Sequence, residues 1–222
     1  MHFEALIKTI KERREALQLT QKNFYLCRKG KKSKIFINLL HYKLACTMKL
    51  SKEEKKFWLR NYRIEKAEDI PVKMNIFKDV DSDCDDEYFY FLSLRVSSIV
   101  EFHLKQSQVT DQGVKYICAF KELETLYLRN HAKITKASIP YFNQMKDLKS
   151  LNITKTKITL TDLCENLNNQ NLREIFISSE DEEENILEKG YIMKERMPKC
   201  NIYLDTSFTT DMFGKAVNPI FD

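Results

Sequence analysis

Hydrophobic positions in the second half of the chain recur with a long, regular period. The motif apolar-x-x-apolar-x-apolar begins four times, at Ile99, Leu123, Leu148 and Leu172. These starts are 24, 25 and 24 residues apart, and a weaker copy begins at Met197, 25 residues further on. A period of roughly 20 to 30 residues is typical of arrays in which every copy is one supersecondary unit. The pattern therefore predicts a stacked array over residues 96–205.

Each copy predicts a strand, a turn and a helix. In Leu126-Tyr127-Leu128, buried and exposed positions alternate as in a strand with one face in a core. Thr135 is a good helix N-cap, because its hydroxyl accepts from free backbone N–H groups. The apolar residues after it recur at helical spacing: Ile139, Phe142 and Met145. One unit alone cannot bury its apolar side, so stacked units are expected to share one continuous core.

These copies resemble the leucine-rich repeat family, in its ribonuclease-inhibitor-like, cysteine-containing subtype. The stretch Val109-Thr110-Asp111-Gln112-Gly113-Val114 is similar to that subtype's helix start. The resemblance implies an α/β fold: a short solenoid of four to five repeats, with parallel strands on the concave face and helices on the convex face. The family usually places Asn or Cys in the turn after each strand. Here those positions hold Ser107, His131, Thr156 and Glu180, so we expect an irregular hydrogen-bonded ladder.

The flanking segments predict caps for the two ends of the array. Residues 1–70 predict a basic helical N-terminal cap domain, with helices over 3–19, 21–27, 35–48 and 52–63. Ser51 and Glu54 have the spacing of a capping box at the start of the last helix. Residues 71–95 predict an acidic linker that ends in an entry strand over 88–95. The aromatic residues of 206–222 predict a C-terminal cap that folds over the last repeat.

The net charge of +5 hides a difference between the two parts of the chain. Residues 1–70 carry 18 Lys and Arg against 8 Asp and Glu, whereas the rest carries 19 against 24. The stretch Ile10–Gln21 is similar to the first helix and turn of lambda-repressor-type helix-turn-helix proteins, although Tyr25 replaces that family's small Ala. A DNA-binding regulator is therefore the alternative function. Its nucleic-acid contacts would be Arg28, Lys29, Lys31, Lys32 and Lys34.

Metal and catalytic motifs are weak or missing. The acidic run 79–87 starts like an EF-hand calcium loop, but it has Cys84 in place of the required Gly and Tyr90 in place of the final Glu. We expect a solvated acidic loop there. The four His are isolated, and no phosphate-binding or nucleophile-elbow motif occurs. The sequence predicts no enzyme, no metal and no cofactor.

Cysteine usage and hydropathy bear on the compartment. The six Cys are scattered, without a CxxC pair, so we expect mostly buried, reduced thiols. The N-terminus has an early acid and no long apolar run, unlike a secretory signal. No apolar stretch approaches the roughly 20 residues that span a bilayer. The sequence predicts a cytoplasmic protein that does not enter membranes.

The side chains between the buried strand positions would form the concave face. They include Tyr, Phe and Arg, which are common in protein–protein hot spots. We expect this set to contact a partner: Glu101, His103, Lys105, Thr125, Tyr127, Arg129, Ser150, Asn152, Lys155, Glu174 and Phe176. The leading hypothesis is a non-catalytic module that binds another protein. The resemblance suggests one concrete version, an inhibitor or immunity protein for a toxin or nuclease, and the acidic runs suggest a basic partner.

Overall fold

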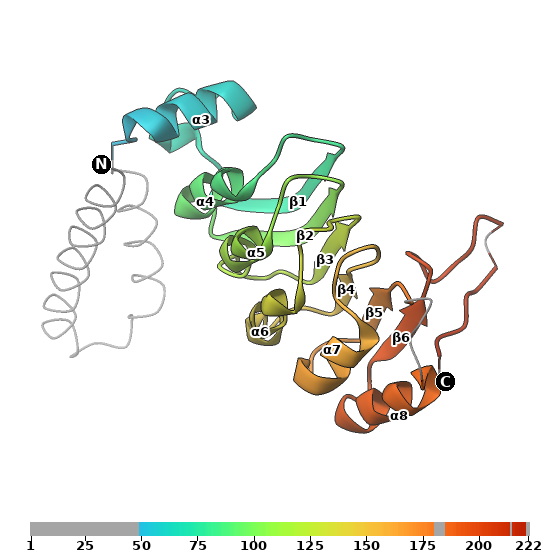
Figure 1. The fold of residues 1–222 in the computed structure, drawn as a ribbon. Helices are drawn as coiled ribbons and strands as arrows, with labels where there is room; N and C mark the ends of the chain where they lie inside the picture. Colours follow the sequence, from blue (N-terminus) through green and yellow to red (C-terminus); the bar gives the residue numbers. More distant parts are fainter. Residues whose placement is uncertain (1–48, 180–184, 214, 221–222) are drawn as a thin grey trace, which may run out of the picture. The chain divides into compact units, whose positions relative to one another are not determined.

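The protein is an α/β protein whose strands form one parallel six-stranded sheet and alternate with helices (Figure 1). The structure is a computed structural model, and it describes residues 49–179, 185–213 and 215–220. The strands are β1 (Lys73–Val80), β2 (Ser98–Lys105), β3 (Thr125–Arg129), β4 (Ser150–Asn152), β5 (Glu174–Ile177) and β6 (Asn201–Leu204). They lie in sequence order, β1-β2-β3-β4-β5-β6, and every neighbouring pair is parallel. The predicted fold class is confirmed, and the architecture is consistent with a leucine-rich-repeat-like solenoid.

The helices of the array all cover the same face of the sheet (Figure 1). They are α4 (Asp86–Arg95), α5 (Asp111–Ile117), η2 (Lys136–Ser138) with α6 (Ile139–Gln144), α7 (Leu160–Asn166) and α8 (Ile186–Arg196). The predicted N-cap of α5, Thr110, accepts from the Gln112 N–H, and Thr135 accepts from the Ala137 N–H at the start of η2. These two helices therefore begin at the Thr residues that the sequence indicated.

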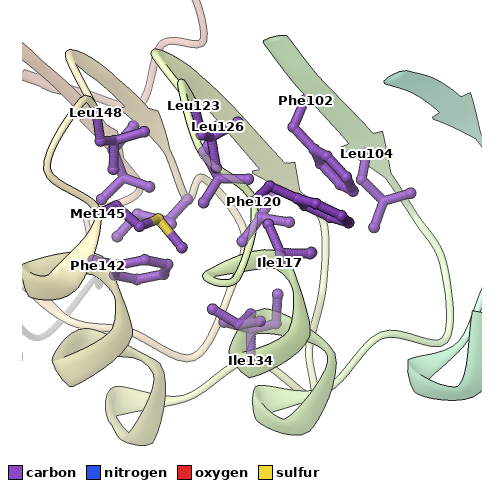
Figure 2. Close-up of a cluster of buried hydrophobic side chains, with 14 of the residues drawn as sticks. Phe102, Leu104, Ile117, Phe120, Leu123, Leu126, Ile134, Phe142, Met145 and Leu148 are labelled. Carbon is purple, nitrogen blue, oxygen red and sulfur yellow. The ribbon is translucent and has the colours of Figure 1, made fainter. Parts of the chain in front are cut away.

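One apolar position of each strand stacks on the equivalent position of the next. The register aligns Phe77, Phe102, Leu126, Leu151, Ile175 and Ile202 across all six strands. Figure 2 shows how such side chains fill the space between strands and helices, where they meet Ile117, Phe120, Ile134, Phe142 and Met145. Nearly all are fully buried. The repeat thus builds one continuous core, as stacked units must.

Gly113 allows two neighbouring helices to approach closely. A Cβ at this position would lie 2.5 Å from Asp86 Oδ1 and 2.8 Å from Val109 Cγ1. Both distances are shorter than real carbon contacts, so a side chain would displace Val109 and the Asp86 carboxylate, which accepts from Thr110. The Gly of the helix-start motif is therefore explained by packing.

The prediction of a strand over 88–95 is wrong, because these residues belong to α4. Asp85 caps this helix by accepting from the Tyr88 N–H, and Phe89 and Leu92 are buried on one side of it. The stretch from Tyr88 to Leu94 is almost uniformly apolar, so its pattern fits the period of a strand and that of a helix equally well. The cap decides in favour of the helix.

The array also begins earlier than predicted, since β1 and α4 form one more strand–helix unit. Met74 and Phe77 precede Ile99 and Phe102 by 25 residues and pair with them in register. The third position of the motif is Asp79, which accepts a 2.7 Å hydrogen bond from Cys84 Sγ. This carboxylate hid the repeat in the sequence. The segment 71–95, predicted as an acidic linker with an entry strand, thus contains a complete unit, and the sheet has six strands where four to five repeats were predicted.

Helix α3 (Lys52–Tyr62) begins with the predicted capping box between Ser51 and Glu54. It packs on α4 through a buried ion pair, Arg95 Nε to Glu54 Oε1 at 2.7 Å. Trp58 is fully buried, and Phe57 stacks on Phe91 of α4 at 5.3 Å between ring centroids. A short 3-10 turn, η1 (Ala67–Asp69), then leads to β1. The other predicted helices, 3–19, 21–27 and 35–48, lie outside the described residues.

The chain after β6 folds back only in part. Ile220 packs against the core, and its N–H donates to the Ile202 carbonyl at 2.8 Å. In the segment between Ile202 and Ile220, Thr210 and Ala216 form an isolated antiparallel β-bridge. The prediction that its apolar side chains cover the last repeat is wrong for Phe208, Met212 and Phe213, which are 57%, 88% and 87% exposed.

Among the described helices, none is both long and apolar enough to cross a membrane.

Candidate partner-binding face

The face of the sheet opposite the helices, called here the strand face, carries three straight rows of side chains. The parallel register aligns them from strand to strand. The first row contains Ile76, Glu101, Thr125, Ser150, Glu174 and Asn201. The central row contains Lys78, His103, Tyr127, Asn152, Phe176 and Tyr203. The third row, at the carboxyl ends of the strands, contains Val80, Lys105 and Arg129.

Ten of the eleven residues predicted for partner contact lie in these rows, and Lys155 does not. Lys155 follows β4 in a left-handed backbone conformation, with φ of 58°. Gln106 and Asn130 adopt the same conformation after β2 and β3. The position next to Arg129 is instead Thr154, whose carbonyl accepts from the Asn130 N–H at 2.9 Å. The third-row position at this strand is therefore Thr154 rather than Lys155.

The central row forms a chain of ring contacts. The rings of His103 and Tyr127 meet edge to face at 4.6 Å between centroids. Tyr127 lies 6.5 Å from Phe176, also edge to face, and Phe176 stacks on Tyr203 at 4.9 Å. Such arrangements are the favoured geometries of aromatic pairs. The row therefore holds its rings in fixed orientations.

The strand face divides into two halves. In the covered half, β4–β6, the start of the C-terminal segment, residues 206–220, reaches back from β6 to β4. Asn152 Nδ2 donates to the Ser207 carbonyl at 3.1 Å, and Thr154 Oγ1 lies 3.4 Å from Ser207 Oγ. Asn152 and Phe176 are each only 1% exposed, and Tyr203 is 7% exposed. In this structure Asn152 and Phe176, predicted to contact a partner, contact the chain itself.

The uncovered half, β1–β3, is free of any described segment. His103, Lys105, Thr125, Tyr127 and Arg129 are all partly exposed, and Glu101 is exposed. Burial is the main cause of a raised Tyr127 pKa, and the nearby Glu174 and Glu101 carboxylates add to it. Tyr127 therefore presents a neutral phenol at neutral pH.

The first row of the strand face carries carboxylates, and the third row carries two cations. In the first row, Glu101 Oε2 lies 3.3 Å from His103 Nε2, and Glu174 Oε2 accepts from Ser150 Oγ at 3.3 Å. In the third row, Lys105 and Arg129 are register partners on adjacent strands. No side-chain hydrogen bond or ion pair joins either of them to another described residue.

The turns after the strands carry the irregular ladder that the sequence predicted. The Ser107 N–H donates to His131 Nε2 at 3.2 Å, and Ser107 Oγ lies 2.9 Å from the same atom. Thr156 instead donates to the Ile153 carbonyl within its own turn, at 2.9 Å. The ladder is thus interrupted between the uncovered and the covered half, while Glu180 lies outside the described residues. Burial lowers the pKa of His131, which is 1% exposed, so this imidazole is neutral at pH 7.

A second ladder, missed in the sequence, joins acids to helix caps one repeat away. Asp86 accepts from the Thr110 N–H at 2.9 Å and from Thr110 Oγ1 at 2.6 Å. Asp111 accepts in the same way from Thr135, at 2.8 and 2.7 Å. The spacing of 24 residues between each acid and its Thr was the signal available in the sequence. Much of the acidic run 79–87 is therefore used for structure.

The next repeat replaces the acid of this ladder by Lys136. Thr159, the equivalent cap, is bonded instead to Asp162 of its own helix in a capping box. Among the described residues, no group of three or more His, Cys, Asp or Glu is arranged to hold a metal ion.

The described cysteines have properties of core residues. Cys84, Cys118, Cys164 and Cys200 are free thiols, and all but Cys118 are buried. Burial raises the pKa of Cys84 and of Cys200 to about 12, and it also raises that of Cys118. Thiols with raised pKa values are poor nucleophiles at neutral pH, because the thiolate is the reactive form.

Comparison with known proteins leaves the function to be argued from the geometry. No protein-family model matches the chain, and no curated protein matches it significantly. The residues of the alternative nucleic-acid hypothesis, Arg28 to Lys34, lie outside the described residues.

Proposed function

We propose that this chain is a non-catalytic module that binds another protein through the uncovered half of its strand face. The observation that carries the proposal is the state of the side chains there. His103 and Tyr127 are oriented by their ring contact, and Lys105 and Arg129 have no anionic partner among the described residues. Preoriented aromatic and Arg side chains provide contact area with little loss of conformational entropy on binding.

We further propose that the array is a leucine-rich repeat of the ribonuclease-inhibitor-like subtype. The six parallel strands with a 24–25-residue period and the helix starts at Thr110 and Thr135 support this assignment. In this proposal the partner is a toxin or nuclease that the protein inhibits. A basic partner would suit the acidic runs, although Asp79, Asp85 and Asp86 already accept hydrogen bonds within the chain.

The test is capture of partners from native lysate by the full chain, with and without nuclease treatment. The variant Tyr127→Ala/Arg129→Ala is run beside the natural chain, and Lys121→Ala/Lys146→Ala serves as a control on surfaces away from the strand face. We expect one stoichiometric protein that survives nuclease treatment, is lost with the first variant and is retained with the control.

The outcome against the proposal would be equal capture by a correctly folded Tyr127→Ala/Arg129→Ala chain. Recovery of nucleic acid would favour the alternative instead. In that case, changing Lys29, Lys31, Lys32 and Lys34 to Ser should abolish binding and flatten its dependence on salt.

A further inference from the structure

The third row of the uncovered half contains two adjacent cations. Lys105 and Arg129 are register partners on neighbouring parallel strands, whose backbones lie about 4.8 Å apart. Side chains that leave one face at this spacing can reach the same carboxylate, and Arg binds carboxylates through two parallel N–H donors. In the next repeat the row ends at Thr154, which is 3% exposed and close to Ser207. The cationic part of the row is therefore bounded on that side.

An aromatic surface lies directly beside these cations. His103 and Tyr127 occupy the central row on the same two strands, with their rings edge to face. The side chain of His103 is 27% exposed, so part of the ring surface is accessible. An apolar side chain of a partner could pack there while its neighbouring acid reached Lys105 and Arg129.

We propose that the uncovered half binds an acidic segment of the partner protein. In this arrangement a carboxylate lies between Lys105 and Arg129, and an adjacent apolar side chain packs on His103 and Tyr127. The inference rests on the proposed function and adds the chemistry of the partner's contact segment. Three strands span about 10 Å, which corresponds to about three residues of extended chain.

The first row argues against a nucleic-acid ligand at the same place. Glu101 and Glu174 lie on the amino-end side of the strand face. A phosphate backbone carries closely spaced charge along its whole length and would meet these carboxylates. A short peptide segment whose acidic residues contact only the third row would not approach Glu101 and Glu174.

The test uses the full chain, labelled with ¹⁵N, and blocked peptides as probes. The peptide Glu-Glu-Phe-Glu-Glu is titrated beside Gln-Gln-Phe-Gln-Gln, Glu-Glu-Ala-Glu-Glu and a short single-stranded DNA. We expect saturable amide shifts in β2 and β3 with the first peptide. Binding should weaken about tenfold when Phe is replaced by Ala and at least as much when the acids are removed.

Two variants with equal changes of charge separate the site from general attraction. Lys105→Gln/Arg129→Gln should reduce the affinity for the acidic peptide about tenfold or more. Lys121→Gln/Lys146→Gln, on exposed positions away from the strand face, should leave it within about twofold. Amide spectra that are unchanged away from the substituted residues show that both variants are folded.

Several results would overturn the acidic-segment inference. They are the lack of saturable shifts, equal binding of the Gln peptide, shifts confined to other regions, and undiminished binding by the Lys105→Gln/Arg129→Gln variant. Stronger shifts in β2 and β3 with the DNA would replace it by a nucleic-acid site. A captured protein that needs Tyr127 but tolerates Lys105→Gln/Arg129→Gln would preserve the proposed function and overturn only this inference.

Discussion

The two halves of the strand face are built from the same strand pattern but differ in what their side chains do. Tyr127 on β3 and Phe176 on β5 occupy the same row and contact each other. Tyr127 is partly exposed, whereas Phe176 is only 1% exposed and lies outside the main core cluster. Phe176 stacks on Tyr203, and its register partner Asn152 donates to the Ser207 carbonyl of the C-terminal segment. Among the described residues, one row thus has buried side chains at one end and accessible ones at the other.

The largest contrast is expected between two substitutions in this row. Phe176→Ala should lower the free energy of unfolding by about 3 kcal/mol or more, because it leaves a cavity where a buried ring stacks on Tyr203. Tyr127→Ala should cost only about 1 kcal/mol, since the ring is partly hydrated in the folded state. Urea denaturation of both variants measures the difference. Equal costs would mean that the two halves are not distinct.

Removal of residues 206–222 should make the two halves alike. Exposure of Phe176 and Tyr203 should lower the free energy of unfolding by about 2–4 kcal/mol. In the truncated chain the additional cost of Phe176→Ala should fall toward that of Tyr127→Ala, which a double-mutant cycle measures. Hydrogen exchange should rise in β5 and β6 and stay unchanged in β2. Additive costs would contradict contact between the segment and Phe176.

Asn152 gives a smaller and more local test. Asn152→Ala removes the donor to the Ser207 carbonyl and the acceptor of the Thr154 N–H and hydroxyl. Loss of these buried hydrogen bonds should cost about 1–3 kcal/mol. The matched control, Ser150→Ala on the same strand, should cost at most about 0.5 kcal/mol. A similar loss for both variants, measured by thermal unfolding, would show that Ser207 does not hold the segment.

The pH dependence of stability tests the uncovered half, because His131 belongs to the hydrogen-bonded ladder in the turns after β2 and β3. Its pKa is lowered by burial from 6.5, so the unfolded chain binds a proton more readily than the folded chain. The contribution of neutral His131 to the free energy of unfolding should therefore be complete above pH 6.5 and decrease as the pH drops below this value. The limiting slope is about 1.4 kcal/mol per pH unit.

His131→Asn removes this titration and keeps a polar side chain in the turn. The difference in unfolding free energy between the variant and the natural chain should shrink or reverse from pH 7 to pH 5.5. A constant difference over this range would show that His131 does not titrate differently in the folded and unfolded states. Because all data are taken as differences, titration of the other His cancels.

Local patterns predicted the parts of the fold that depend on neighbours in sequence. The alternation around Tyr127, the cap at Thr135 and the capping box at Ser51 all involve interactions within a few residues, and each is present. The helix over 86–95 was missed because its apolar run suits two periods. The strand β1 was missed because Asp79 occupies an apolar position, which only its bond to Cys84 explains.

Eight of the eleven residues predicted to contact a partner lie in the rows of the strand face and are not buried. The sequence could not distinguish them from the other three. Lys155 follows the third-row position, which Thr154 occupies, and Asn152 and Phe176 are buried. Phe176 follows the same strand motif as Tyr127, so nothing local marks it as buried. The Asp–Thr ladder was also overlooked, although its 24-residue spacing was visible.

The sequence by itself determined the repeat, the order of strand and helix within it, and the side of each strand that enters the core. These follow from periodic burial, which every copy repeats over a short stretch of chain. Only the tertiary structure decided where the array begins and which strand-face side chains the described residues leave accessible. It also decided that Lys105 and Arg129 stand side by side without an anionic partner among those residues. Those features depend on contacts between residues 24 to 55 positions apart, such as Asn152 with Ser207, that no local pattern encodes.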